Sequence, residues 1–133
     1  MDRQVTEYFA ELIKLASDNF DKINYINDVT PKRAILRMQG QYGSYRVIVT
    51  ELLDDVGRKY SYYVLNGDRV EAGFDNSPDP RAIRLKYGKI SSEHTGECVP
   101  HLHLEDKNRL VLTEEMTFGD FVDWLLGNLT IMR

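Results

Sequence analysis

The sequence contains little that would mark an exported protein or one that coats nucleic acid. Cys98 is the single cysteine among 133 residues, so an internal disulfide is excluded and a zinc site built from several thiolates is not expected. No apolar run approaches the roughly 18 residues of a membrane span, and the first residues lack the pattern of a signal peptide. The formal net charge of −4 argues against bulk attraction to phosphate backbones. We therefore expect a cytoplasmic protein without a membrane association.

Length and composition favour one folded domain. With 133 residues, 42% of them hydrophobic, the chain can bury about two-thirds of its unfolded surface, whereas two domains of half this size would each be marginal. We find no internal repeat, low-complexity tract or linker. The prediction is a single α+β domain over residues 1–133, with an N-terminal helix, an antiparallel sheet of about five to six strands and a C-terminal helix packed on the sheet.

Hydrophobic spacing predicts the two helices. Apolar residues recur at helical intervals from Asp2 to about Asn19, which is typical of a helix that packs one face on a sheet. Near the other end, Thr117 and Asp120 have the spacing of a capping box, with Asp in the position where Glu or Gln is usual. Apolar residues at helical spacing follow as far as Leu129, so a closing helix is expected there.

Stretches rich in β-formers lie between these helices. The residues Asn66-Gly67 are a strong hairpin signal between two of them. Val99 to Leu104 is a short candidate for a fifth strand, and Leu110 to Leu112 either continues it or forms another. The four earlier candidates cover 32–39, 45–53, 59–65 and 69–74.

Residues 76–97 contain two prolines and two glycines and have no clear period. This pattern predicts a long connection without an element of its own. Connections of that length are uncommon unless they serve a function.

All three histidines lie close together, as His94, His101 and His103. On a strand, His101 and His103 project to one face about 6 to 7 Å apart, while the leucines after them point into the core. Histidine changes charge near neutral pH, so the pair suits a general base and a general acid, as in RNA hydrolysis by its own 2′-hydroxyl. Two alternatives stay open: a metal site completed by Asp75, Asp79 or His94, and two exposed strand residues without a role.

Two neighbouring segments could complete such a site. Asp75, in the turn Phe74-Asp75-Asn76-Ser77-Pro78, could orient an imidazole as carboxylates do for catalytic histidines, or serve only the turn. The following connection is basic and carries an aromatic residue that could stack on a base, with a solvated loop as the alternative. The residues of that basic segment are Arg81, Arg84, Lys86, Tyr87 and Lys89.

The order of these pieces resembles the TumE-type toxins, small proteins of presumed type II toxin–antitoxin pairs. The resemblance covers roughly residues 34–129, with an aromatic-Asp-Asn turn followed later by a strand that contains Pro-His. The residues that match the family pattern are Asp75, Asn76, Pro78, His101 and His103. This chain departs from the pattern where Asp79 and Pro80 replace the family's first histidine pair. If that pair takes part in the family's activity, the chain is a weakened or divergent member.

The resemblance implies a cytoplasmic protein with a cognate antitoxin and an activity directed at RNA or nucleotides. The hypothesis assigns acid and base roles to His101 and His103, an orienting role to Asp75, and phosphate contacts to Arg81 and Arg84. Asn76, Lys86 and Tyr87 complete the expected binding residues. No cofactor or metal is part of this leading hypothesis. The alternative is a non-catalytic module whose tyrosine-rich sheet binds a protein partner or a second copy in a homodimer.

Overall fold

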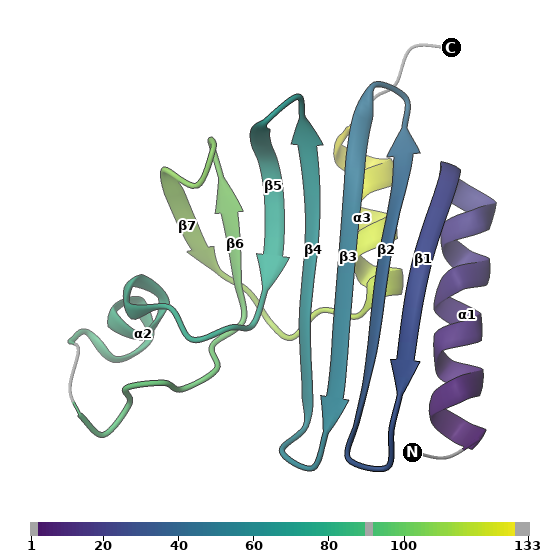
Figure 1. Ribbon diagram of the computed structural model, residues 1–133. Coiled ribbons are helices and arrows are strands. Elements are labelled where there is room, and N and C mark those ends of the chain that lie inside the picture. The colour runs from purple at the N-terminus through teal and green to yellow at the C-terminus, as the bar shows by residue number, and fades with distance from the viewer. Residues whose placement is uncertain (1–2, 90–91, 130–133) are drawn as a thin grey trace.

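The computed structural model describes residues 3–89 and 92–129 and has a single seven-stranded antiparallel sheet with three helices (Figure 1). This confirms the predicted α+β class, with more strands than the five to six expected. The elements in chain order are α1 (Arg3–Asn19), β1 (Asp21–Val29), β2 (Arg33–Tyr42), β3 (Tyr45–Asp54), β4 (Arg58–Asn66), β5 (Arg69–Asp75), α2 (Pro80–Tyr87), β6 (His101–Leu104), β7 (Arg109–Leu112) and α3 (Phe118–Asn128).

The strands follow one another across the sheet in chain order, each antiparallel to the next. Tight turns join most neighbouring pairs, so most of the sheet is a simple meander. The exception is the link from β5 to β6, which carries α2 and a longer connection (Figure 1). The residues expected to carry function therefore lie on β5 and β6 and in the one long insertion between neighbouring strands.

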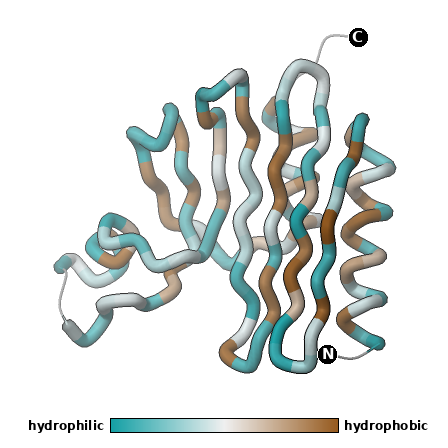
Figure 2. Tube along the Cα trace, viewed as in Figure 1, coloured by the Kyte–Doolittle hydropathy of each residue, from teal (hydrophilic) through white to brown (hydrophobic). Residues whose placement is uncertain are grey.

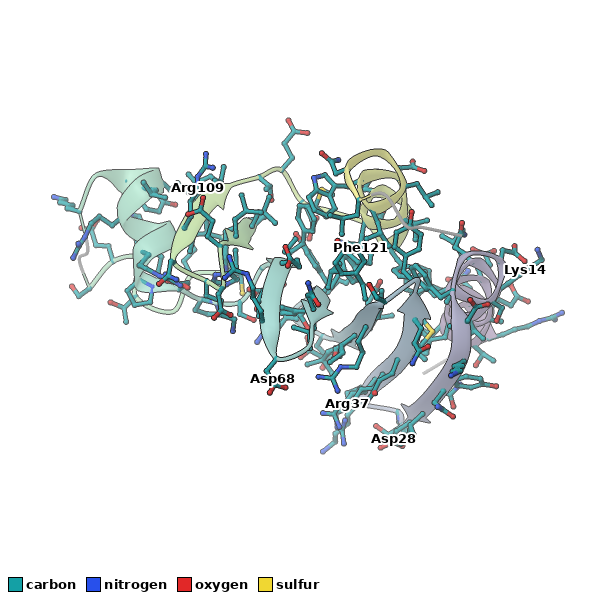
Figure 3. All side chains as sticks on the ribbon, turned by 90° about the horizontal axis from the view of Figure 1, so that it is seen from above. Lys14, Asp28, Arg37, Asp68, Arg109 and Phe121 are labelled. Carbon is teal, nitrogen blue, oxygen red and sulfur yellow. The ribbon has the colours of Figure 1, made fainter. Side chains whose placement is uncertain are left out.

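The helices α1 and α3 cover one face of the sheet. Buried apolar residues of β2 to β4 alternate with more exposed residues, most of them polar, and Figure 2 shows the change of hydropathy along the strands. Seen from above, Phe121 of α3 lies between that helix and the strands, whereas Arg37 of β2 extends from the other face (Figure 3). Phe9 and Leu12 of α1 join the same core. One layer of helices therefore stabilises the sheet and leaves the opposite face for other uses.

Both terminal helices agree with the spacing of their apolar residues. The first begins at Arg3, and the predicted start at Asp2 lies outside the described residues. The capping box of α3 is present, because Thr117 accepts from the Asp120 amide and the Asp120 carboxylate accepts from the Thr117 amide. Among the described residues, helices that combine the length and the apolar character of a membrane span are absent.

The sequence analysis missed β1. Nearly all its residues are exposed, so it lacks the apolar alternation that identifies a half-buried strand. It forms because its backbone pairs with β2 from Asp21 to Val29. Its outer residues Tyr25 and Ile26 remain 51% and 72% exposed.

The prediction that residues 76–97 contain no element is wrong, because α2 lies within them. Asp79 caps the helix by accepting from the Arg81 amide, Pro80 occupies the first turn, and Gly88 ends it with a φ of 78°. Ala82 and Ile83 pack with Val99 and against Leu110 of β7, forming a second small core. Only eight residues long, α2 depends on these partners from later in the chain.

Candidate functional site

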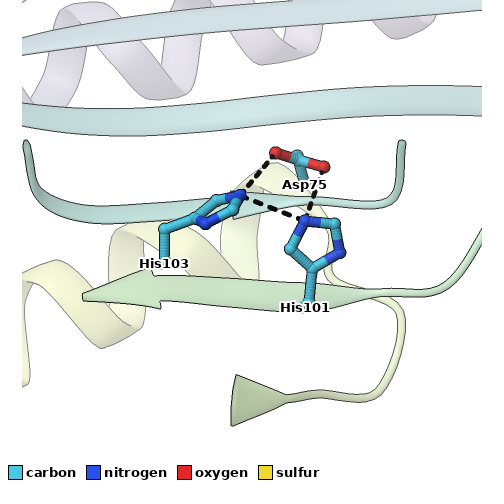
Figure 4. A group of neighbouring side chains, drawn as sticks. All are labelled: Asp75, His101 and His103. Atoms are coloured by element: carbon cyan, nitrogen blue, oxygen red, sulfur yellow. Dashed lines mark hydrogen bonds and ion pairs between the residues drawn. The ribbon is translucent and has the colours of Figure 1, made fainter. Parts of the chain in front are cut away.

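The register of β5 against β6 assembles the site. Asp75 lies opposite His101, and Gly73 lies opposite His103. Because side chains alternate along a strand, Asp75, His101 and His103 share the face that α1 and α3 leave uncovered. Figure 4 shows the two imidazoles and the carboxylate turned toward one another.

Polar atoms of the three side chains lie close to one another. His101 Nε2 lies 3.1 Å from Asp75 Oδ1 and 3.1 Å from His103 Nε2 (Figure 4). His103 Nε2 lies 3.4 Å from Asp75 Oδ2. A fourth group is close by, because Asp79 Oδ2 is 4.0 Å from His101 Nε2. Two imidazole nitrogens and a carboxylate therefore converge within hydrogen-bonding range.

These polar side chains are almost completely buried. The exposed fractions are 1% for His101, 4% for His103 and 6% for Asp75. The alternative of two exposed strand histidines is therefore wrong. Burial of polar groups is costly unless they are paired, so the arrangement must be maintained by the partners that each group has in the folded chain.

Both ring nitrogens of His101 are engaged. Nδ1 lies 2.7 Å from the carbonyl oxygen of Val99. A carbonyl oxygen can only accept, so Nδ1 carries a proton and donates it. Nε2 is then the atom that faces Asp75 and His103, and whether it carries a proton decides the chemistry of the site.

The environment separates the pKa values of the two histidines. Burial by itself would lower the pKa of His101, but its hydrogen bonds to Asp75 and Val99 outweigh this effect and raise that pKa. Burial and the nearby His101 charge both lower the pKa of His103. Burial would raise the pKa of Asp75, yet the hydrogen bond from His101 leads a set of interactions that lower it. Such opposed shifts are typical of functional sites.

Tyr63 is a site residue that the sequence analysis missed. Its hydroxyl donates to Asp75 Oδ2 at 2.9 Å, and its ring stacks on His103 with centroids 6.2 Å apart. The ring has room because Gly73 is directly opposite it across the β4–β5 pair. A Cβ at Gly73 would come within 2.2 Å of the ring. A regular hairpin counted back from the Asn66-Gly67 turn would not pair Tyr63 with Gly73, because the register of β4 and β5 shifts between Val64 and Leu65, so the sequence held no clear signal for this contact.

Gly73→Ala is expected to destabilise the protein by about 1–3 kcal/mol, because the added methyl would force the Tyr63 ring from its place. Urea unfolding measured by circular dichroism gives the change in free energy of unfolding. The same substitution in a Tyr63→Ala background should cost much less, because the opposing ring is absent. An equal cost in both backgrounds would show that the ring does not lie against Gly73.

The first residues of α2 also reach the site. Arg81 lies 3.5 Å from His103 Nδ1, and it bonds Asp79 and the Lys107 carbonyl at the β6–β7 turn. The Lys107 ammonium lies 5.0 Å from the centre of the Tyr63 ring. Two cations therefore flank the buried centre, and Lys107 was not among the residues expected there.

Other expected binding residues have different partners. Asn76 bonds the backbone of β4 through both ends of its amide, accepting from Tyr60 and donating to Arg58. Tyr87 stacks face to face on His94 with centroids 3.6 Å apart and donates to Glu97. The structure therefore brings Asp75, Arg81, His101 and His103 together and keeps His94 with α2.

The remaining basic residues lie farther along the segment. Lys86 pairs with Glu97 at 3.5 Å, while Arg84 and Lys89 are exposed. Arg84 lies at the C-terminal end of α2, where its carbonyl accepts from the Gly88 amide. Of the predicted basic residues, Arg81 is the one with a contact to the histidine pair.

The fold and this centre define an α+β protein with a buried Asp–His–His cluster on the open face of an antiparallel meander. Comparison of the chain with protein-family models, with curated proteins and with solved structures found no significant match.

Proposed function

We propose that this protein is the toxin-like component of a toxin–antitoxin pair and acts on RNA or nucleotides at the Asp75–His101–His103 centre. The observation that carries the proposal is the convergence of three buried titratable side chains, with their nearest atoms 3.1 to 3.4 Å apart. Paired imidazoles and a carboxylate with separated pKa values are the groups that phosphodiester chemistry needs. The resemblance to TumE-type toxins rests on these three residues together with Asn76 and Pro78.

The surrounding charges agree with a phosphate-bearing substrate. The chain has a net charge of −4, but Arg81 and Lys107 lie at the edge of the centre. Arginine binds phosphate oxygens through a fork of donors, so Arg81 is our candidate for the phosphate contact. Arg84, farther along α2, is exposed and is the second candidate.

Growth after induced expression tests this function. The wild-type chain is expected to arrest growth, and His101→Ala combined with His103→Ala is expected to abolish the arrest. Loss of a proton-transfer group or an equivalent reactive group should reduce RNA cleavage by at least about 100-fold. Total RNA from the induced cells shows whether cleavage accompanies the arrest. Where a small gene adjoins this one, its co-expression as the antitoxin should restore growth.

His94→Ala is the matched control, because His94 is a histidine of the same segment that stacks on Tyr87 instead. It should remain as toxic as the wild type at equal protein level, measured by immunoblot. A wild-type chain without toxicity would contradict the toxin assignment. If the double variant is as toxic as the wild type, the toxin assignment holds, but the two histidines take no part in its mechanism.

A non-catalytic interaction module is the second candidate. Tyr60 and Tyr62 of β4 are buried under the helices, and Tyr63 bonds Asp75, so these tyrosines are not available to a partner. The observation that favours the module lies on β1, where Tyr25 and Ile26 are exposed beside a shallow depression of about 420 Å³. Toxicity that is lost on replacing Ile26 and kept in the double histidine variant would favour this candidate.

A further inference from the structure

We propose that Asp75, His101 and His103 bind one divalent transition-metal ion. The inference deepens the proposed function, since it assigns a cofactor to the same centre, and it rests on that function only for the ion's role in catalysis. One atom from each of the three side chains lies within 4.8 Å of the others. The proposal stands on their distances, on the proton positions and on the groups that hold them.

The distances match the edges of a coordination shell. Zinc lies about 2.0–2.2 Å from nitrogen and oxygen ligands, so two ligands of a tetrahedral site are about 3.3–3.6 Å apart. The observed separations are 3.1 Å, 3.1 Å and 3.4 Å. The two distances to Asp75 end on different oxygens, Oδ1 and Oδ2, so an ion held by both Nε2 atoms could be bound by one or both oxygens of the carboxylate.

The hydrogen bond at Nδ1 of His101 leaves Nε2 as the atom that can bind an ion. Nδ1 donates to the Val99 carbonyl, so Nε2 of a neutral ring presents a lone pair. That lone pair faces a carboxylate oxygen at 3.1 Å, which also can only accept. Either a proton on Nε2 or a metal ion removes this conflict, and the ion can bind His101, His103 and Asp75 together.

Groups behind the ligands hold them in orientation. The Val99 carbonyl fixes the ring of His101, which is the usual support of a metal-binding histidine. Tyr63 and the Ser77 amide donate to the two oxygens of Asp75, each at 2.9 Å. With an ion bound through Nε2, His103 Nδ1 would carry a proton and could not accept from Arg81, which lies 3.5 Å away and keeps its bonds to Asp79 and Lys107.

Two imidazoles and one carboxylate suit a first-row divalent ion such as Zn²⁺ or Mn²⁺. Three protein ligands leave a coordination position for water or a phosphate oxygen. Asp79 Oδ2, 4.0 Å from His101 Nε2, lies near enough to bind a water at that position. An ion so placed could polarise a phosphate oxygen, in keeping with the proposed function.

Calorimetric titration of the purified, chelator-treated chain with Zn²⁺ alone, and separately with Mn²⁺, tests the site. We expect one ion per chain for at least one of the two metals. His103→Gln should weaken binding by at least about 100-fold, because it removes a ligand, and Tyr63→Phe by about 10-fold, because it releases the Asp75 carboxylate. His94→Ala should bind as the wild type does, since its ring lies on Tyr87.

Circular dichroism of each variant separates loss of the ligand from loss of the fold, and Tyr63→Phe keeps the ring that fills the space over Gly73. No saturable binding of either ion by the folded wild type would overturn the proposal. So would unchanged affinity in folded His103→Gln, or a loss of affinity confined to His94→Ala.

The metal test needs no substrate, so it fails or succeeds apart from the growth test. If the chain is toxic but binds neither ion, the proposed function still holds, and the histidines would act by proton transfer. If the chain binds one ion at these residues but is not toxic, the metal site is supported and the toxin assignment is contradicted.

Discussion

Glu51→Ala is expected to lower the free energy of unfolding by about 3–5 kcal/mol, because it leaves a charge network broken inside the core. Glu51 is 0% exposed and accepts from the hydroxyls of Tyr8 and Tyr62. Arg58 lies 3.4 Å from the same carboxylate and also donates to the Met116 carbonyl. One acidic residue therefore ties α1, β4 and the segment before α3 together.

Removal of this carboxylate leaves the hydroxyls of Tyr8 and Tyr62 without their acceptor and Arg58 without its buried counter-charge. The expected loss is large for that reason, and not because an ion pair is in itself strongly stabilising. Urea unfolding of the variant gives the change, with Glu11→Ala on the exposed side of α1 as the control, expected within about 0.5 kcal/mol of the wild type. A Glu51 variant as stable as that control would show that the network contributes little.

Phe121→Ala is expected to destabilise the protein by about 3–5 kcal/mol through the cavity it leaves. The side chain is fully buried, and its ring lies 5.4 Å from Tyr62 and 6.1 Å from Phe74, measured between centroids. Aromatic rings contribute more than their buried area alone, because their edges and faces attract. Phe121 therefore packs α3 against both β4 and β5.

Leu126→Ala on the same helix is the control, because Leu126 is 51% exposed. Its effect on unfolding should stay within about 0.5 kcal/mol. If the two variants have equal stability, α3 does not pack as described.

Local patterns in the sequence were sufficient for the elements whose stability is local. The helix over Arg3–Asn19, the capping box at Thr117 and the turn after Asn66 each depend on residues a few positions apart. For the same reason the class of the fold could be predicted. The edge strand β1 could not be predicted, because its exposed residues show no apolar alternation. The short helix α2 could not be predicted either, because it packs against Val99 and Leu110 from later in the chain.

The candidate site divides in the same way. Alternation along a strand predicted that His101 and His103 share a face, and the turn after Phe74 identified Asp75. Their burial depends on the β5–β6 pairing and on the N-terminal end of α2. Tyr63 enters through the β4–β5 register, with Gly73 leaving room for its ring.

The sequence by itself therefore determined the α+β class, the terminal helices, the hairpins and the identity of the polar residues with chemical potential. The tertiary structure decided that Asp75 faces both histidines, that Arg81 reaches them, and that Asn76 and Tyr87 are used elsewhere. The reason is physical: spacing fixes which way a side chain points from its own strand, but pairing between distant strands fixes what it meets.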